Sequence, residues 1–263
     1  MWLVHPAARA LLPVALRRGV SANMVSVIGF VVGTGAAIAF ARWQAPGMAL
    51  AGLLLGVLWL ICDGLDGMIA RATGTASAIG RVMDGVCDHG VFILIYVLLA
   101  TSIGTEYAWL LAITAGAAHV VQSSLYEGER ARFHRRVRGD AAPIAHPDLG
   151  SAIVRGYDAI AGSIDRIAAR FDEAMRAAPD PITAGREYGH AAAQPMKAMS
   201  LLSANVRLFA IVLACLVRDP ALFWWFEIVV LTLVAVMTIT WHRRIERRLV
   251  LGFPDTAGLQ AGA

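Results

Sequence analysis

The fold of this chain is decided by the sequence CDGLDGMIAR at residues 62–71, followed after a short gap by GRVMDGVCD at residues 80–88. Four aspartates lie in these two stretches, next to strongly apolar segments: Asp63, Asp66, Asp84 and Asp88. A carboxylate beside bilayer hydrocarbon is costly unless it is paired, hydrated or bound to a cation. Four neighbouring carboxylates also repel one another. The pattern therefore predicts a divalent-cation site at a membrane surface.

The spacing of the aspartates supports this prediction. Asp63 and Asp66 are three residues apart and Asp84 and Asp88 are four apart, so each pair shares one face of a helix. The glycine-containing segment 72–82 suits a turn between two antiparallel helices. Two carboxylate pairs that face each other would form an oxygen-rich cage, which suits Mg²⁺, Mn²⁺ or Ca²⁺. The alternative is a set of helix-end aspartates that are solvated at the interface, which gives no reason for this periodicity.

The composition independently indicates an all-α, polytopic membrane protein. Of the 263 residues, 58% are hydrophobic and only 16% are charged, and the mean hydropathy is +0.62, which is too apolar for an ordinary soluble domain. A transmembrane helix needs about 20 apolar residues. Six segments meet this requirement, and we expect spans near 23–41, 47–69, 83–103, 107–126, 200–217 and 221–241.

The chain divides into five parts on this basis. We expect an N-terminal interfacial amphipathic helix (1–22), followed by four spans with the aspartate motif (23–127) and a cytoplasmic insert (128–199). Two further spans (200–248) and a C-terminal tail (249–263) complete the chain. Arginines concentrate before the first span, around the motif, in the insert and after the last span, which places both termini and the motif in the cytoplasm. The net charge of +4 is then a matter of topology and contact with anionic lipid, and we expect no nucleic-acid partner.

Within the insert, residues 128–150 are basic and rich in glycine and proline, and they are predicted to form a loop. Apolar residues from Ile153 to Met175 recur at helical spacing and predict an amphipathic helix that lies on the membrane or on the spans, with a coiled-coil contact as an alternative. Residues 177–196, with three prolines, are interpreted as a linker. Glu227, near the outer end of the last span, is predicted to be interfacial.

The aspartates carry a family resemblance. The pattern D-x2-D-G-x2-A-R-x8-G-x3-D-x3-D is matched at all eight specified positions between Asp63 and Asp88. It resembles the motif of the CDP-alcohol phosphotransferases (CDP-alcohol phosphatidyltransferases), integral membrane enzymes of phospholipid synthesis. A looser likeness covers about the first 130 residues, and the insert is a departure from compact members.

The resemblance implies the roles of the site residues. Asp63, Asp66, Asp84 and Asp88 would bind Mg²⁺ or Mn²⁺, as two ions, and Asp88 would also be the catalytic base. Judged by their residue types, five further residues are candidates for contact with the CDP group: Gly67, Ala70, Arg71, Ser77 and Gly80. The alternatives are helix packing of small residues for Gly67 and Ala70, a snorkelling lipid contact for Arg71, a solvated loop position for Ser77 and turn geometry for Gly80. Outside the motif, Gln122, Tyr126 and Arg207 lie on the cytoplasmic side of their predicted spans and are candidates for an acceptor pocket, with snorkelling or structural pairing as the alternative for Arg207.

The resemblance further implies a homodimer in a membrane, expected to be a bacterial inner membrane. The expected reaction is transfer of a phosphatidyl group from CDP-diacylglycerol to a small hydroxylated acceptor with release of CMP. Transfer of a CDP-linked head group to a lipid alcohol is the alternative within the family. A non-catalytic cation-binding protein or transporter, or an inactive partner subunit, remain alternatives from other classes.

Overall fold

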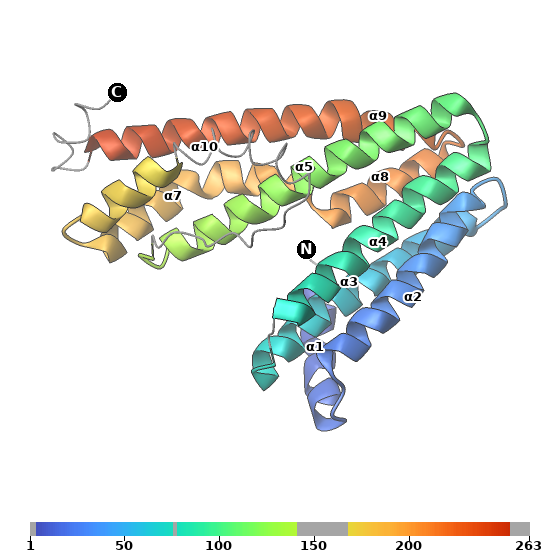
Figure 1. Ribbon diagram of the computed structural model, residues 1–263, viewed down its shortest axis with the longest axis horizontal. Helices are drawn as coiled ribbons and strands as arrows, with labels where there is room; N and C mark the ends of the chain where they lie inside the picture. The colour runs from blue at the N-terminus through green and yellow to red at the C-terminus, as the bar shows by residue number, and fades with distance from the viewer. Residues whose placement is uncertain (1–3, 76–77, 141–167, 253–263) are drawn as a thin grey trace. The chain divides into compact units, whose positions relative to one another are not determined.

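The computed structural model describes residues 4–75, 78–140 and 168–252, and within these it describes the side chains of all residues except 78–86, 88, 251 and 252. The described residues are helices joined by short connections, as the sequence predicts (Figure 1). The elements are α1 (Val4–Arg17), α2 (Ala22–Ala41), α3 (Met48–Thr73), α4 (Ala78–Ile103), α5 (Glu106–Arg136), α7 (Pro181–Met199), η1 (Ser200–Leu202), α8 (Ala204–Leu216), α9 (Ala221–Trp225), the π-helical η2 (Phe226–Leu231) and α10 (Thr232–Gly252). Residues 168–177 are also helical.

The chain forms two compact units. The first comprises residues 1–119 and 204–230, and the second comprises residues 120–203 and 231–263. Helix α5 and the helical run from α9 to α10 each begin in the first unit and end in the second. The aspartate motif belongs to the first unit, and the predicted insert 128–199 belongs to the second.

In the first unit, α2 packs against both α3 and α4, the two helices that carry the motif (Figure 1). Two glycines on α2 permit this close approach. A Cβ atom built at Gly29 would lie 3.1 Å from Cys62 Cβ, and one at Gly33 would lie 2.4 Å from a methyl group of Val91. Small residues at such contacts are typical of helix packing in membranes. Ser21 caps α2, because its Oγ accepts a hydrogen bond from the backbone N–H of Met24.

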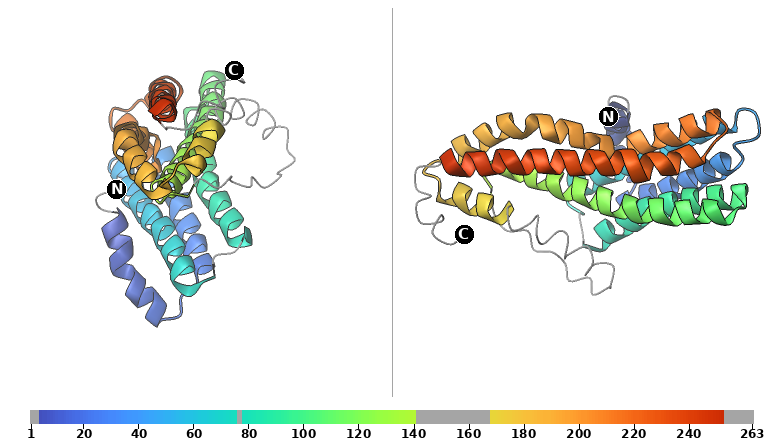
Figure 2. Two further views of the ribbon diagram at one scale, coloured as in Figure 1. Left: turned by 90° about the vertical axis from the view of Figure 1, so that its left-hand side faces the viewer. Right: turned by 90° about the horizontal axis from the view of Figure 1, so that it is seen from above.

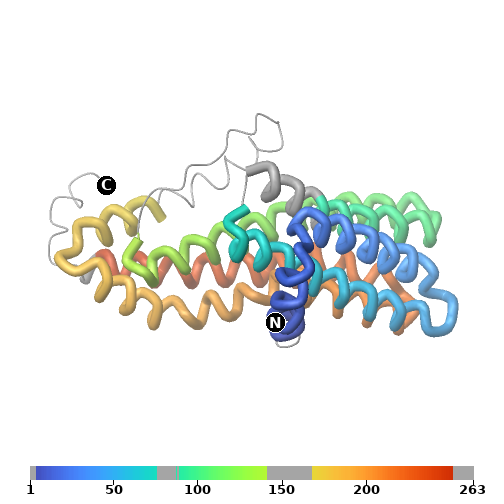
Figure 3. The backbone as a smooth tube through the Cα atoms, turned by 90° about the horizontal axis from the view of Figure 1, so that it is seen from below, coloured from blue at the N-terminus to red at the C-terminus, as the bar shows by residue number. Residues whose placement is uncertain are grey.

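Helix α1 packs against α3 (Figure 3). Its alanines Ala8 and Ala15 are buried against residues of α3 such as Leu65 and Ile69. Leu11 and Leu16 remain exposed, at 45% and 39%. Helix α1 thus buries alanines against α3 and leaves leucines exposed on another side.

In the second unit, α7 and α10 run side by side (Figure 2). The buried core of this unit comes from residues 168–177 and α7, and it contains Phe171, Met175, Ala184, Tyr188 and Ala192. The predicted amphipathic helix 153–175 is helical over its described part from residue 168, and its earlier residues lie outside the described ranges.

Two predictions for the insert are wrong. The predicted loop 128–150 begins as helix, because α5 continues to Arg136 with its charged side chains in a buried cluster. The predicted linker 177–196 is mostly helix α7. The proline at its start, Pro181, occupies the first turn, where proline is favourable, and Asp180 caps the helix through the backbone N–H groups of Ile182 and Thr183.

Several helices in the described residues are long and apolar enough to cross a membrane. Four single helices qualify: Ala22–Ala41, Met48–Thr73, Glu106–Arg136 and Ala221–Val250. The pair Pro181–Leu202 and Ala204–Leu216, bent by 43°, would count as a fifth span, and His89–Ile103 of α4 is a shorter apolar helix. These helices are those of an integral membrane protein.

Candidate functional site

The first half of the aspartate motif occupies the last turns of α3. Asp66 is buried, with 4% of its surface exposed, and Asp63 is half-buried. The helix ends just beyond Arg71, where Gly74 adopts a left-handed conformation with φ of 66° and donates its N–H to the carbonyl of Ala70. Both carboxylates therefore lie within three turns of a helix end, at the edge of an apolar helix that could span a membrane.

Asp66 is held by a residue that sequence reasoning missed. Ser26 on α2 donates a hydrogen bond from its Oγ to Asp66 Oδ2 over 2.6 Å, and Ser26 is itself 8% exposed. Its position 40 residues before Asp66 gives no signal in the sequence, because the contact depends on how α2 packs against α3.

Two of the predicted CDP-contacting residues lie together. The guanidinium of Arg71 folds back over Gly67, so that a Cβ atom built at Gly67 would lie 3.3 Å from Arg71 Nη1. Arg71 is exposed, and Ala70 between them is half-buried. The absence of a side chain at Gly67 thus leaves room for a cationic group beside the aspartates of the same helix.

The second half of the motif begins α4. Gly80, Asp84 and Asp88 all lie within Ala78–Ile103, so Asp84 and Asp88 are one helical turn apart. Their side chains, and the whole of Ser77, lie outside the described residues. Among the described side chains, Asp63 and Asp66 offer carboxylate oxygens from one helix, and such oxygens suit a hard cation.

The three candidates for an acceptor pocket do not belong to one unit. Gln122 and Tyr126 are buried one turn apart on α5 in the second unit, and Gln122 Nε2 donates to Thr232 Oγ1 over 3.0 Å. Arg207 lies on α8 in the first unit, where it is 1% exposed and donates from Nε to Glu227 Oε1 over 2.7 Å.

Glu227 is therefore not interfacial, which corrects the prediction from the sequence. It is fully buried in the π-helical segment η2, where it pairs with Arg207 and lies 3.3 Å from His119 Nδ1. The ring of His119 also lies against Phe92, with centroids 4.4 Å apart, and near His89, at 6.4 Å. Arg207, Glu227 and His119 thus form a buried polar cluster, and the half-buried His89, which follows Asp88, lies next to it.

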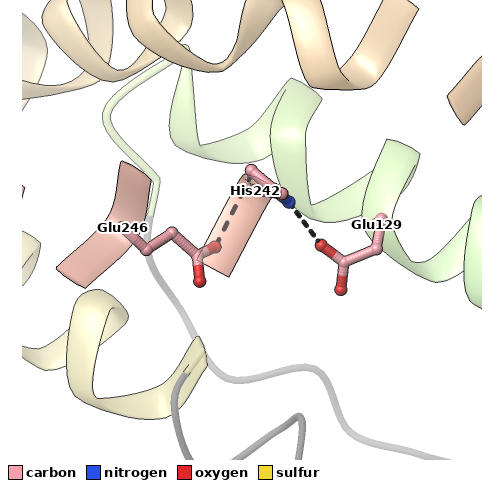
Figure 4. Close-up of side chains that lie close together, drawn as sticks. All are labelled: Glu129, His242 and Glu246. Carbon is pink, nitrogen blue, oxygen red and sulfur yellow. Dashed lines mark hydrogen bonds and ion pairs between the residues drawn. The ribbon is translucent and has the colours of Figure 1, made fainter. Parts of the chain in front are cut away.

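A second charged cluster, in the second unit, was not predicted. Glu129 on α5 and His242 and Glu246 on α10 are all buried, and they offer ligand atoms within 4.8 Å of one another (Figure 4). His242 Nδ1 lies 2.8 Å from Glu129 Oε2, and its Nε2 lies 2.9 Å from the hydroxyl of Tyr188. By geometry alone, the Glu129–His242–Glu246 group could hold a metal ion.

The surrounding arginines make a cation an unsuitable occupant of this group. Glu129 accepts hydrogen bonds from Arg132 and Arg243, and Glu246 accepts hydrogen bonds from Arg136 and Arg243. Arg136 also donates to Asp172 over 2.6 Å. The carboxylates of Glu129, Glu246 and Asp172 are thus paired with the guanidinium groups of Arg132, Arg136 and Arg243. A divalent ion would have to displace arginines that already neutralise these carboxylates.

The cluster was missed because its partners are distant in the sequence. Glu129, Arg132 and Arg136 follow one another at helical spacing, as do His242, Arg243 and Glu246, and such spacing is equally typical of an exposed charged face. Only the packing of α10 beside α5, which joins residues 110 or more positions apart, makes these faces a buried network.

Comparison with known proteins agrees with the resemblance. No curated protein matches the chain. Residues 20–135 match the family model described as CDP-alcohol phosphatidyltransferase. The matched residues contain the whole aspartate motif, on α3 and α4, together with Ser26 and most of α5. Over residues 20–135 the chain is similar to the CDP-alcohol phosphatidyltransferase family, whose members are transferases of substituted phosphate groups.

Proposed function

We propose that this protein transfers a phosphatidyl group from CDP-diacylglycerol to a small hydroxylated acceptor and releases CMP. The observation that carries the proposal is the complete eight-position motif within the family match, with its first two aspartates at the end of an apolar helix. The family match over residues 20–135 supports transfer from a CDP-alcohol. The choice of CDP-diacylglycerol follows from the size of the chain and from its number of apolar segments.

In the proposed reaction, the acceptor hydroxyl oxygen forms a bond to the β-phosphorus of the CDP-alcohol while the bond from that phosphorus to the CMP oxygen breaks. Asp88 accepts the hydroxyl proton, as the last aspartate of the motif. The departing CMP carries the negative charge of the broken bond. Arg71, beside Gly67, is a cation that can form hydrogen bonds to the phosphate oxygens.

Asp63, Asp66, Asp84 and Asp88 would hold Mg²⁺ or Mn²⁺, as two ions. A bound divalent ion would neutralise the pyrophosphate and the developing charge on CMP. The buried position of Asp66 supports this assignment, since a carboxylate in apolar surroundings is stabilised by a cation. The Glu129–His242–Glu246 group is not proposed as the catalytic metal site, because arginines already pair with its carboxylates.

The topology proposed with this function has six spans, with both termini and the motif in the cytoplasm of a bacterial inner membrane, and a homodimeric assembly. The apolar helices Ala22–Ala41, Met48–Thr73 and Glu106–Arg136 overlap the spans expected near 23–41, 47–69 and 107–126, and they extend beyond them. Gln122 and Tyr126 of the second unit are proposed to contact the acceptor, and Arg207 of the first unit is a separate candidate. Because Arg207 is paired with Glu227, its charge is not fully available to a phosphorylated acceptor.

The buried Arg207–Glu227 pair is the observation that favours a second class of function, a transporter. An ion pair inside apolar helices marks ion pathways in many membrane proteins. One sample of the protein reconstituted into vesicles distinguishes the two functions. An enzyme would release CMP, whereas a transporter would carry ions across the vesicle membrane.

The proposal is tested by incubating the purified protein with CDP-diacylglycerol, Mg²⁺ or Mn²⁺ and a panel of alcohols that includes glycerol phosphate, inositol, inositol phosphate and serine. Release of CMP that requires one of these alcohols would support phosphatidyl transfer and name the acceptor. Release only from a CDP-linked head group in the presence of a lipid alcohol would support the alternative polarity. Release from neither substrate would favour an inactive subunit.

A further inference from the structure

A hydroxyl group outside the motif donates a hydrogen bond to one of its aspartates. Ser26 lies on α2 and Asp66 on α3, and the Ser26 Oγ–Asp66 Oδ2 distance is 2.6 Å. Both residues are buried, Ser26 at 8% exposed and Asp66 at 4%. A short hydrogen bond to a carboxylate in such surroundings is stronger than one between neutral groups.

The simplest alternative is a helix serine that bonds only its own backbone. Ser26 Oγ does lie 3.2 Å from the carbonyl of Ala22, one turn earlier. A hydroxyl has a single hydrogen, however, and the charged acceptor is nearer by 0.6 Å. The hydrogen is therefore directed at Asp66, and the contact to Ala22 is secondary.

The packing of α2 on α3 fixes the distance between the two side chains. One turn after Ser26, a Cβ atom at Gly29 would meet the Cβ of Cys62 at 3.1 Å, and Cys62 lies one turn before Asp66. The backbones are thus in close contact at the level of the hydrogen bond. Neither α2 nor α3 can shift to release Asp66 without separating this contact.

We propose that Ser26 is a positioning residue for the cation site, whose hydroxyl holds the Asp66 carboxylate in one orientation before a divalent ion binds. The inference rests on the proposed function, because it takes Asp66 to be a cation ligand. Hydrogen bonds to metal-ligating groups orient those groups, and their removal commonly lowers metal affinity or activity by about 10-fold to 100-fold.

The test measures Mn²⁺ binding directly, by electron paramagnetic resonance of free Mn²⁺, with the full-length protein in detergent and no CDP substrate. Ser26→Ala removes the hydroxyl, and Ser26→Cys replaces it with a weaker donor of similar size. Ser26→Thr keeps a hydroxyl. The matched control is Thr34→Val, which removes a hydroxyl from the same helix where it bonds the carbonyl of Phe30.

We expect Ser26→Ala and Ser26→Cys to weaken Mn²⁺ binding by about 10-fold or more, and Ser26→Thr and Thr34→Val to change it by less than about 2-fold. In the transfer assay, the Mn²⁺ concentration for half-maximal rate should rise in Ser26→Ala, while the rate at saturating Mn²⁺ stays within about 3-fold of the native rate. A merely structural role for Ser26 would not produce this separation.

Two results would overturn the inference in distinguishable ways. Native-like Mn²⁺ affinity in both Ser26→Ala and Ser26→Cys would remove the role of Ser26 and leave the proposed function intact. If the native protein bound no Mn²⁺ and its transfer activity needed no divalent ion, the cation site itself would be wrong, and the role of Ser26 would fall with it.

Discussion

Replacement of Arg136 by methionine tests how the second unit is held together. Arg136 is fully buried at the end of α5. Its guanidinium donates to Asp172, to Glu246, to the hydroxyl of Tyr188 and to the carbonyl of Ala168, which come from three other parts of the unit. Methionine keeps most of the side-chain volume and removes all of these hydrogen bonds.

The magnitude follows from what remains after the substitution. Removal of one partner from a buried ion pair costs about 3–5 kcal/mol, because the other charge stays buried. Glu246 keeps two hydrogen bonds from Arg243, and Asp172 is partly solvated, so the lower end applies. We expect a loss of about 3 kcal/mol, which corresponds to an increase on the order of 100-fold in the opening of the second unit.

Hydrogen exchange of the backbone amides of α7 and α10 measures this opening. Arg244→Met is the matched control, since Arg244 is exposed on α10 and its replacement should change exchange by less than about 3-fold. The double variant Arg136→Met with Glu246→Leu should recover part of the loss, because it no longer buries a carboxylate at position 246 that has lost its Arg136 partner. Unchanged exchange in Arg136→Met would refute the view that the charged network holds this unit together.

Two further predictions concern a site residue and a helix cap. Gly67→Ala should displace the flexible Arg71 guanidinium and raise the KM for the CDP substrate several-fold, with little change in thermal stability. The control Gly116→Ala, whose Cβ would meet nothing within 4 Å, should change neither the KM nor the stability. Equal KM values for Gly67→Ala and the native protein would remove the proposed role of Arg71. The hydrogen bonds from Thr183 lower the pKa of Asp180, so its contribution to stability is present above the ordinary aspartate pKa and is lost as the pH falls through the lowered value. Asp180→Ala should therefore lower the melting temperature of the protein at about pH 7, and this decrease should become smaller toward about pH 3. Asp180→Asn should have little effect, because asparagine also caps helices. A difference in melting temperature between Asp180→Ala and the native protein that did not depend on pH would contradict this account.

The sequence predicted the parts of the fold that depend on local patterns. The apolar runs predicted the helices of the first unit, and the spacing of Asp63 and Asp66 predicted two carboxylates at one end of α3, where the structure has them. The family resemblance, drawn from eight positions, is confirmed by the match over residues 20–135. These signals need no knowledge of which helices become neighbours.

The contacts between distant segments could not be predicted in this way. Asp180-Pro181 looked like an interruption, yet the same two residues are a favourable start for α7. Ser26 is one of many small polar residues in the chain, and only the packing of α2 on α3 brings it to Asp66. Glu227 stands near the end of a predicted span, and only the position of α8 supplies the arginine that pairs with it.

The most direct test of the proposed function is the rate of CMP release from CDP-diacylglycerol by the native protein, Asp88→Asn and the control Asp219→Asn. Asp219 lies outside the motif and accepts a hydrogen bond from the N–H of Ala221, which asparagine can also accept. Release by the native protein and by Asp219→Asn should require both a divalent ion and an acceptor alcohol, and it should be lost in Asp88→Asn. Undiminished release in Asp88→Asn, or release that continues without a divalent ion, would contradict the proposed function of the motif.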